Sequence, residues 1–307
     1  MAVTVTQLVA FLTVVRRGSV TAAADELVVT QPSVSAAINA LERELGTTLM
    51  ERSGRNLRPT AAGRAYVSYA TNVLGLLEQG ARAAREASGD SRTSLRIGAV
   101  MTAGEYLVAP LLRMFREANP ELEITLHVGN REDVFQRLVD HEVDVAITGR
   151  IPEELGLQGR QFLPNEFVMI TAPGDPLAKG RPVAVQELMG RPWLMREPGS
   201  GTRVLSEEFL AAHELHPKVL TLGSNGAIKQ AVGLGLGVAL QSRCAVQLEL
   251  QLGVLGTIRV RGGLPRRAWY VVHSGVGPVR REVSDFVDFA CSRAAQHALA
   301  RTLAPAA

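Results

Sequence analysis

Apolar and polar positions follow a regular helical pattern in residues 19–45, near the amino end of the chain. Thr30 is a typical helix N-cap residue, and Pro32 stands in the first turn, where proline is tolerated. The apolar residues after it recur at spacings of four, three and four, the period of one helix face: Val34, Ile38, Leu41 and Leu45. The pattern predicts two short helices joined by a tight turn, the first of them rich in alanine.

The opposite face of the second helix carries short or planar hydrogen-bonding side chains: Gln31, Ser33, Ser35, Asn39 and Arg43. Such groups read base edges or contact phosphates when a helix lies in the major groove of DNA. A helix with an apolar side and a small polar side, docked on a preceding helix, is what a helix-turn-helix requires. A purely structural helical hairpin has the same apolar stripe, so this pattern alone leaves both interpretations open.

Residues 49–60 predict a β-hairpin directly after this motif. The segment Ser53-Gly54-Arg55-Asn56 is a turn signal between two short extended stretches. The hairpin carries three arginines suited to sequence-independent phosphate contacts: Arg52, Arg55 and Arg58. An ordinary basic loop is the alternative. Residues 1–60 hold six Arg against five Asp and Glu, a net charge of +1, so the argument depends on where the arginines stand.

The order of these residues resembles the winged helix-turn-helix of LysR-type transcriptional regulators. The resemblance runs from Leu8 to Thr60 and rests on Phe11, residues 18–24, Leu27, residues 30–35, Ile38, Leu41, Glu42, Leu45, Gly46, Leu49, Arg52 and residues 59–63. It implies a regulator, not an enzyme, that binds an operator in double-stranded DNA. Many relatives carry long polar or basic side chains where Ala36 and Ala37 stand here, so the operator sequence cannot be carried over.

A long helix is predicted over residues 61–88, with Thr60 as its cap. Small and apolar residues form a seam close to a heptad repeat: Tyr66, Ala70, Val73, Leu77, Gly80 and Ala84. A monomer can bury this seam on itself, but a dimer fits better, because dimeric readers match the spacing of half-sites on DNA. The family resemblance implies a dimer through this helix, a tetramer made of two dimers, and RNA polymerase as a further partner.

Composition and charge narrow the class of protein. The 307 residues suit two or three domains, and 46% hydrophobic with 21% charged residues is a soluble globular composition. The formal net charge of +3 is not that of a polycation. Arg16 and Arg17 follow the apolar stretch 8–15, the reverse of a signal peptide, and no run reaches the roughly 20 apolar residues that span a bilayer. We therefore expect a cytoplasmic protein with no membrane partner.

From Leu95 onward, apolar runs alternate with helical patterns, as in parallel α/β folds. The first unit has expected strands over 95–100, 122–128 and 143–148 and helices over 104–118 and 132–141. The second has strands over 193–196, 219–222 and 237–241 and helices over 201–215, 227–234 and 242–252. Residues 166–172 and 267–273 connect the units, and a last helix covers 279–299. Two α/β halves joined by two crossing strands resemble periplasmic-binding-protein folds, which is the effector domain of the LysR-type family.

The predicted fold class is therefore multidomain α and α/β. A winged helix-turn-helix covers residues 1–60, with its motif at about 19–38, and a linker and dimerisation helix covers 61–88. A hinge at 89–94 leads to an effector-binding domain over 95–307. Its subdomain I covers about 95–165 and 270–307, and its subdomain II about 166–269.

Ligands of open α/β sheets bind beyond the carboxyl ends of strands, where helix N-termini favour anions. Three loops combine such a place with hydroxyl or amide side chains: residues 100–104, 196–203 and 223–226. With the strand end near 148, they yield the candidate effector-binding residues Thr102, Ala103, Thr148, Arg150, Arg196, Ser200, Gly201, Thr202, Ser224 and Asn225.

Two alternatives stay open for this site. Ser200 or Thr202 can cap its own helix, and Arg150 and Arg196 can equally pair with Glu154 or Glu197. Residues 196–203 and 224–231 resemble the branch of the family that regulates carbon fixation and sulfur assimilation. That resemblance implies a small oxyanion or phosphorylated metabolite as the effector.

The sequence shows no catalytic set, metal site or cofactor motif. The glycines at 233, 235 and 237 follow a helix rather than open one, unlike a dinucleotide fingerprint, and the six histidines are scattered. Cys244 and Cys291 are far apart within apolar helical patterns, which favours buried free thiols. An enzyme with a helical appendage and a ligand-binding module with protein-binding helices are the rival interpretations. The absence of an acid–base set argues against the enzyme, and a gel shift with the DNA flanking the gene distinguishes the ligand-binding module from a regulator.

Overall fold

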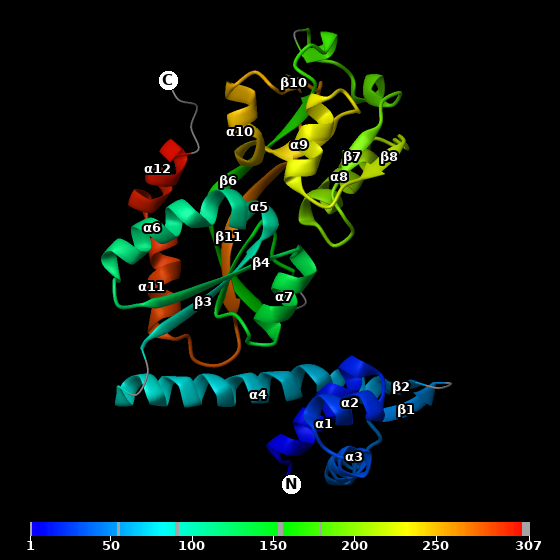
Figure 1. Cartoon of the computed structure of the whole chain (residues 1–307), viewed down its shortest axis with the longest axis vertical. Helices are drawn as coiled ribbons and strands as arrows, with labels where there is room; N and C mark the ends of the chain where they lie inside the picture. The colour runs from blue at the N-terminus through cyan, green and yellow to red at the C-terminus, as the bar shows by residue number, and fades with distance from the viewer. Residues whose placement is uncertain (1, 54–55, 90–91, 153–155, 179, 303–307) are drawn as a thin grey trace. The chain divides into compact units, whose positions relative to one another are not determined.

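The computed structural model of the chain describes residues 2–53, 56–89, 92–152, 156–178 and 180–302 (Figure 1). The chain divides into two compact units: Met1–Ser91 with Val139–Glu142, and Arg92–Leu138 with Val143–Ala307. A helical unit with a β-hairpin followed by an α/β unit confirms the predicted fold class. Within the described ranges, every helix is too short or too polar to cross a bilayer.

The first unit is a helical domain with a two-stranded wing. Its elements are α1 (Val5–Arg17), α2 (Val20–Leu27), α3 (Gln31–Leu45), β1 (Met50–Ser53), β2 (Asn56–Pro59) and α4 (Ala61–Ser88). Phe11, Val34 and Leu41 are at most 1% exposed and lie in one core that joins α1, α2, α3 and the start of α4. The apolar stripe predicted for α3 is thus the side that packs on the rest of the domain.

Hydroxyl side chains fix where these four helices begin. Each accepts a hydrogen bond from the backbone N–H three residues further on, which satisfies a donor that the first turn leaves free. The capping residues are Thr4, Ser19, Thr30 and Thr60. Helix α2 ends at Val28, whose φ of 54° is unusual for a β-branched residue. This left-handed residue forms the tight turn predicted before α3.

Helix α4 exposes only part of the predicted seam. Tyr66 and Ala70 pack into the core of the first unit, so this part of the seam is covered within the chain. Val73 and Leu77 are 46% and 52% exposed, and Tyr69, which the seam did not include, is 69% exposed. The apolar face available to a partner therefore begins about one turn later than the sequence predicted.

The first half of the second unit is a mixed sheet between two layers of helices. Its strands are β3 (Ser94–Val100), β4 (Glu123–Gly129) and β5 (Val145–Thr148), and β3 is parallel to both neighbours. Its helices are α5 (Met101–Ala103), the π-helical turn η1 (Gly104–Val108), α6 (Ala109–Ala118), α7 (Arg131–Val139), α11 (Arg281–Ala290) and α12 (Arg293–Thr302). Val145 and Ile147 pack in the core with α6, α11 and α12, whereas Ala146 packs with α7. Alternate residues of β5 thus serve opposite faces of the sheet.

The second half repeats this layering around shorter strands. Its elements are η3 (Pro176–Ala178), η4 (Val185–Leu188), β7 (Trp193–Met195), α8 (Gly201–Ala212), β8 (Val219–Thr221), α9 (Asn225–Gly233), β9 (Ala239–Ser242), α10 (Arg243–Gln251) and β10 (Gly256–Ile258). Trp193 and Met195 belong to the core beside α8, and Leu194 belongs to the core beside α9 and α10. β7 and β8 run parallel, as the sequence predicted for this unit.

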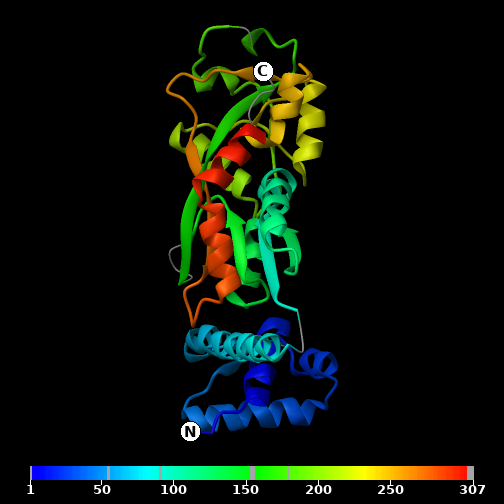
Figure 2. The same cartoon turned by 90° about the vertical axis from the view of Figure 1, so that its left-hand side faces the viewer.

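Two long antiparallel strands, β6 (Leu157–Thr171) and β11 (Arg266–Ser274), connect the halves (Figure 2). The sheet order is β10-β6-β11-β5-β3-β4, with β9 paired to β6 as well. Both connections were predicted, but β6 begins nine residues earlier than residue 166, the predicted start. The crossing strands thus belong to the sheets of both halves.

Two details differ from the sequence predictions. The last helix is two helices, because the Ser292 hydroxyl accepts a hydrogen bond from Ala295 N and starts α12. Cys244 and Cys291 are free but half-buried rather than buried. Burial still raises the pKa of the Cys244 thiol to about 11, so this thiol stays protonated at neutral pH.

A buried carboxylate in the second half gives a prediction for stability. Arg191 pairs with Asp175, and Thr171 and Leu177 N donate further hydrogen bonds to it, which lowers the pKa of Asp175 to about 2. Asp175→Asn is expected to reduce the free energy of unfolding by about 2 kcal/mol at pH 7. Since the folded pKa lies below the unfolded one, the difference is fully present above about pH 5 and falls to about half by pH 3. Urea unfolding of the unmodified protein and of the Asp175→Asn variant between pH 7 and pH 3 measures this difference in the free energy of unfolding. A difference that does not change with pH would contradict the prediction.

Candidate functional site

Helix α3 presents the predicted reading face to solvent. Gln31, Ser33 and Asn39 are exposed, and Ser35 is half-buried. The Thr30 hydroxyl, which caps the helix, lies 2.8 Å from the Ser33 hydroxyl. Arg43 is exposed, and its Nε donates to the backbone oxygen of Asn39 at 3.3 Å. The amide of Asn39 and the hydroxyls near the start of α3 are therefore accessible to another molecule.

The wing displays arginines on both of its faces. β1 and β2 pair in antiparallel register, with Arg52 opposite Leu57 and Glu51 opposite Arg58. Residues directly opposite each other share a face of the hairpin, so Arg52 and Arg58 lie on different faces. Both are exposed, and Leu57 packs against the core. Arg55, the third predicted arginine, lies outside the described residues.

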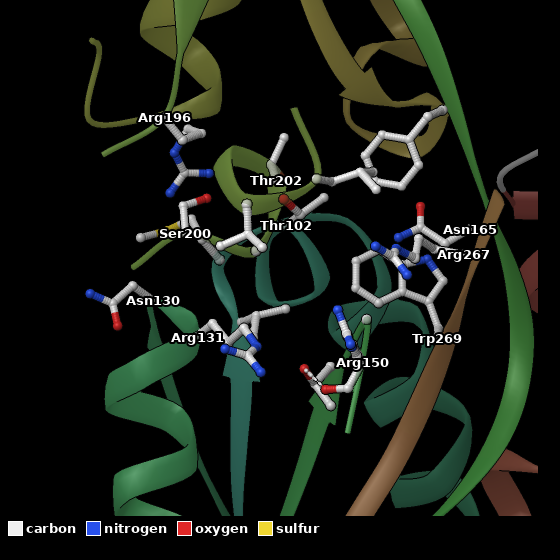
Figure 3. A pocket seen from close by; sticks show the side chains of 18 of the residues that line it. Thr102, Asn130, Arg131, Arg150, Asn165, Arg196, Ser200, Thr202, Arg267 and Trp269 are labelled. Atoms are coloured by element: carbon white, nitrogen blue, oxygen red, sulfur yellow. Dashed lines mark hydrogen bonds between the residues drawn. The ribbon is translucent and has the colours of Figure 1, made fainter. Parts of the chain in front are cut away.

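A cavity of about 380 Å³ lies between the two halves of the second unit (Figure 3). It is formed where strands end and helices begin, the place that the sequence predicted for a ligand. Seven of the ten candidate effector-binding residues line it: Thr102, Thr148, Arg150, Arg196, Ser200, Gly201 and Thr202. Ala103, Ser224 and Asn225 are not among its lining residues.

The start of α8 opens into this cavity. Ser200 is its N-cap residue and is 4% exposed, and within the described part of the chain its side chain makes no capping hydrogen bond. The alternative that Ser200 caps its own helix is therefore not what the structure shows. Ser224, in contrast, accepts a hydrogen bond from Ala227 N at 3.1 Å and does cap α9. A helix start with uncapped backbone N–H groups is a favourable place for an anion.

Arg196 is a buried member of a polar network. It is 1% exposed, and its guanidinium makes two hydrogen bonds to Glu197, at 2.7 and 2.8 Å, and one to Asn225 Oδ1, at 2.9 Å. Asn225 Nδ2 donates in turn to Glu105 at 2.8 Å and to Thr102 at 3.3 Å. Of the two roles left open for Arg196, the structure shows the pairing with Glu197. Asn225 ties the two halves together behind the cavity.

A second contact between the halves lies beside this network. Lys229 of α9 donates to the Tyr106 hydroxyl at 3.1 Å and pairs with Glu249 at 2.7 Å. Burial raises the pKa of the Tyr106 hydroxyl, which therefore stays protonated at neutral pH. With the Asn225 bonds, this contact fixes one side of the cavity.

The remaining arginines line the opposite walls. Arg150 Nη1 lies 3.1 Å from Glu208, and Arg267 pairs with the same carboxylate. Glu154, the partner that the sequence offered to Arg150, lies outside the described residues. The guanidinium carbon Cζ of Arg131 lies 5.2 Å from the centre of the Phe135 ring, and no ion pair of Arg131 is found among the described residues. Figure 3 shows Asn130 and Arg131 on one side of the cavity and Arg267 with Trp269 on the other.

Sequence reasoning missed part of this lining: Asn130, Arg131, Asn165, Arg267 and Trp269. Asn130 caps α7 by accepting a hydrogen bond from Asp133 N at 2.8 Å, and an asparagine before a helical pattern is a recognisable signal. Arg267 and Trp269 come from a crossing strand, where nothing local marks a ligand site.

The charges of the cavity do not cancel. Four arginines line it, and no acidic side chain does so within the described ranges. Glu197 pairs with Arg196, and Glu208 is shared by Arg150 and Arg267. The four lining arginines and the two carboxylates that pair with them carry a formal charge of +2, which suits an anionic ligand.

Comparisons with known proteins agree with this architecture. Residues 5–64 match the family model "Bacterial regulatory helix-turn-helix protein, lysR family", and residues 88–295 match "LysR substrate binding domain". The chain is 34% identical over 287 residues to the transcriptional activator CmpR of Synechocystis sp., which covers 93% of this chain and 94% of that protein. It is 38% identical over 267 residues to the regulator CbbR of Rhodospirillum rubrum, with 87% and 88% covered.

A solved structure extends the likeness to the ligand-binding unit. The regulatory domain of Synechocystis CcmR in complex with 2-PG has a TM-score of 0.62 and 30% identity, and the match covers 65% of this chain and 96% of that one. The family models together span both units, and the similar proteins are named transcriptional regulators rather than enzymes. The chain therefore belongs to the LysR family of DNA-binding transcriptional regulators.

Proposed function

We propose that this regulator binds a small anionic metabolite with two acidic groups in the cavity, and that the bound anion modulates its action at an operator in double-stranded DNA. The observation that carries the proposal is the formal charge of +2 on the lining arginines and their paired carboxylates, in a cavity that the N-terminus of α8 faces. The similar domain of CcmR was solved with 2-PG, 2-phosphoglycolate, which carries a phosphate and a carboxylate. The anion itself is the effector, and no cofactor is invoked.

The two ends of such a ligand have different partners. The phosphate lies at the start of α8, where the backbone of Gly201 and the hydroxyls of Ser200 and Thr202 are available. Arg150 and Arg267 bind a second acidic group, since a guanidinium matches a carboxylate geometrically. Thr102, Thr148 and Arg196 complete the wall. Ala103, Ser224 and Asn225 support this wall from behind without touching the ligand.

The DNA-binding surface consists of α3 and the wing. Side chains near the start of α3 and on its exposed face read base edges: Gln31, Ser33, Ser35 and Asn39. Arg43 and the wing arginines Arg52, Arg55 and Arg58 contact phosphates. The exposure of Ser33, Asn39 and Arg58 supports this assignment.

Two copies of the chain act together on DNA. The exposed residues Tyr69, Val73 and Leu77 of α4 form an apolar stripe suited to a second copy. We assign residues 1–60 to DNA binding, 61–88 to dimerisation, 89–94 to a hinge and 95–307 to effector binding. Pairs of dimers form a tetramer, and RNA polymerase is the partner in activation. The bacterial cytoplasm, where the DNA lies, is the place of action.

Effector binding shifts an equilibrium between two arrangements of the halves that flank the cavity. The ligand contacts residues of both halves, Thr102 in the first and Thr202 in the second. A ligand changes such an equilibrium only through its different affinity for the two arrangements. The arrangement that it favours then sets the spacing of the two DNA-binding domains in the dimer.

Titration of the full chain with 2-phosphoglycolate tests the proposal, with glycolate, which lacks the phosphate, as the comparison. Calorimetry is expected to detect 2-phosphoglycolate binding that is at least about tenfold tighter than that of glycolate, because a charged hydrogen-bonded group contributes about 1.5–3 kcal/mol. Equal affinities, or no binding of either compound, would leave the cavity without the proposed role.

Thr202→Val is expected to weaken 2-phosphoglycolate binding about tenfold to a hundredfold and to leave DNA binding unchanged, since a methyl group replaces a hydroxyl at the start of α8. The matched control is Thr221→Val in β8, outside the cavity lining, which makes the same chemical change. An unaltered titration with the Thr202 variant would exclude contact between this hydroxyl and the ligand.

A further inference from the structure

We propose that Glu208 is an internal counter-anion of the cavity, which competes with the effector for Arg150 and Arg267. The proposal rests on the proposed function, because it concerns affinity for the same anion. The Glu208 carboxylate accepts a hydrogen bond from Arg150 Nη1 at 3.1 Å and another from Arg267 Nη2. One carboxylate of the protein therefore occupies both arginines in the way that an acidic group of a ligand would.

The position of Glu208 in α8 explains how it reaches these arginines. Val204 and Leu205 line the cavity, and Glu208 follows them by four and three residues. Residues at these spacings share one face of a helix, so Glu208 lies one turn further along the same face. The backbone N–H groups at the start of α8, near Gly201, attract an anion. The carboxylate of Glu208, seven residues or about 10 Å further along the helix axis, repels it.

Arg150 belongs to the first half and Glu208 to the second, so the Arg150–Glu208 pair is a contact across the cavity, and Arg267 joins it from a strand that both halves share. Arg150 follows β5, and Arg267 lies in the crossing strand β11. The carboxylate that holds them comes from the second half. A ligand that binds at the start of α8 and reaches the same two arginines spans the same gap. Glu208 and the second acidic group of the ligand therefore compete for one pair of cations.

The exposure of the bridge favours competition over a fixed structural role. The side chains of Arg150, Glu208 and Arg267 are 59%, 44% and 30% exposed. Ion pairs this exposed contribute little to stability, so an incoming anion displaces the carboxylate at little cost. Once displaced, the carboxylate stays within a few ångströms and repels the bound anion. Removing its charge raises the formal charge around the cavity from +2 to +3.

Glu208→Gln keeps the size of the side chain and removes its charge. In calorimetric titrations of the full chain in about 50 mM salt, this variant is expected to bind 2-phosphoglycolate about tenfold more tightly than the unmodified protein. The gain should shrink in about 0.5 M salt, because screening weakens a repulsion between exposed charges. A purely structural effect would not follow the salt concentration in this way.

Glu207→Gln is the matched control, since it removes the same charge from the neighbouring residue of α8. Glu207 pairs with Arg203 at 2.7 Å, and neither residue is among those lining the cavity. Its affinity for 2-phosphoglycolate is expected to stay within about twofold of the unmodified protein. An equal gain in this control would show a general effect of net charge and would overturn the proposal.

The remaining outcomes separate this proposal from the proposed function. If the unmodified protein binds 2-phosphoglycolate and Glu208→Gln binds it equally or more weakly, Glu208 orients the arginines and does not compete. The competition is then refuted, and the effector site stands. If neither protein binds the compound at any salt concentration, both proposals fail together.

Discussion

Replacing Ser33 by glutamate is expected to abolish retardation of the DNA flanking the gene while helix α3 stays folded. Ser33 is the third residue of α3, and Thr30 Oγ1 accepts a hydrogen bond from its backbone N–H at 3.3 Å. Glutamate at this position completes a capping box with Thr30, and its negative charge is favourable at a helix start. On the exposed face of α3 that is proposed to contact DNA, the same negative charge repels phosphates, and a dimer has one such glutamate in each subunit. We expect the dissociation constant to rise by at least about a hundredfold.

Gel retardation and thermal unfolding of the same preparation measure the two effects separately. Thr6→Glu is the control for added charge, because Thr6 is exposed in the first turn of α1 and not on α3. It should retain most of the affinity for DNA. Unimpaired retardation by Ser33→Glu, with an unchanged unfolding temperature, would remove α3 from the interface.

Local signals explain why helix α3 and its buried apolar stripe were predicted so closely. Residues 30–45 contain a cap, a first-turn proline and an apolar period, each of which acts within a few residues along the chain. The structure accordingly places α3 at Gln31–Leu45 with Val34, Ile38 and Leu41 buried. The seam of α4 was predicted less well, because only the folded domain shows that Tyr66 and Ala70 are already covered.

The crossing strand shows where local reasoning stops. Residues 157–165 read LQGRQFLPN, a stretch of mixed polar and apolar residues with a glycine and a proline, and they form the first part of β6. They are strand because they pair with β11, more than a hundred residues away, and this pairing follows from the sheet order rather than from propensity. The same pairing brings Arg267 beside the cavity.

Some residues of the candidate effector site were predictable from local sequence signals, and others were not. Residues 199–203 were found because glycine and hydroxyl residues at a helix start are a local signal. The partner of Arg196 is its neighbour Glu197, also within reach of sequence reasoning. The partner of Arg150 is Glu208, 58 residues away, and only the structure reveals it.

Arg196→Met is expected to destabilise the effector domain by about 3 kcal/mol, because it removes the buried cation to which Glu197 and Asn225 are bonded. In a domain of this size, such a loss lowers the unfolding temperature by about 6–12 °C. Methionine is similar in length and apolar, so the effect arises from the unpaired Glu197 and Asn225 rather than from a large void. Differential scanning calorimetry of the full chain measures the change.

Arg243→Met is the matched control, because Arg243 pairs with Glu166 in an exposed ion pair whose side chains are 50% and 68% exposed. Exposed pairs contribute about 0–1 kcal/mol, so this variant should shift the unfolding temperature by at most about 4 °C. Equal shifts in the two variants would mean that water enters and solvates the Arg196 network. Arg196 would then be a solvated cation of the cavity that is available to the effector. It would not be the buried residue that connects Glu197 to Asn225, which in turn bonds Thr102.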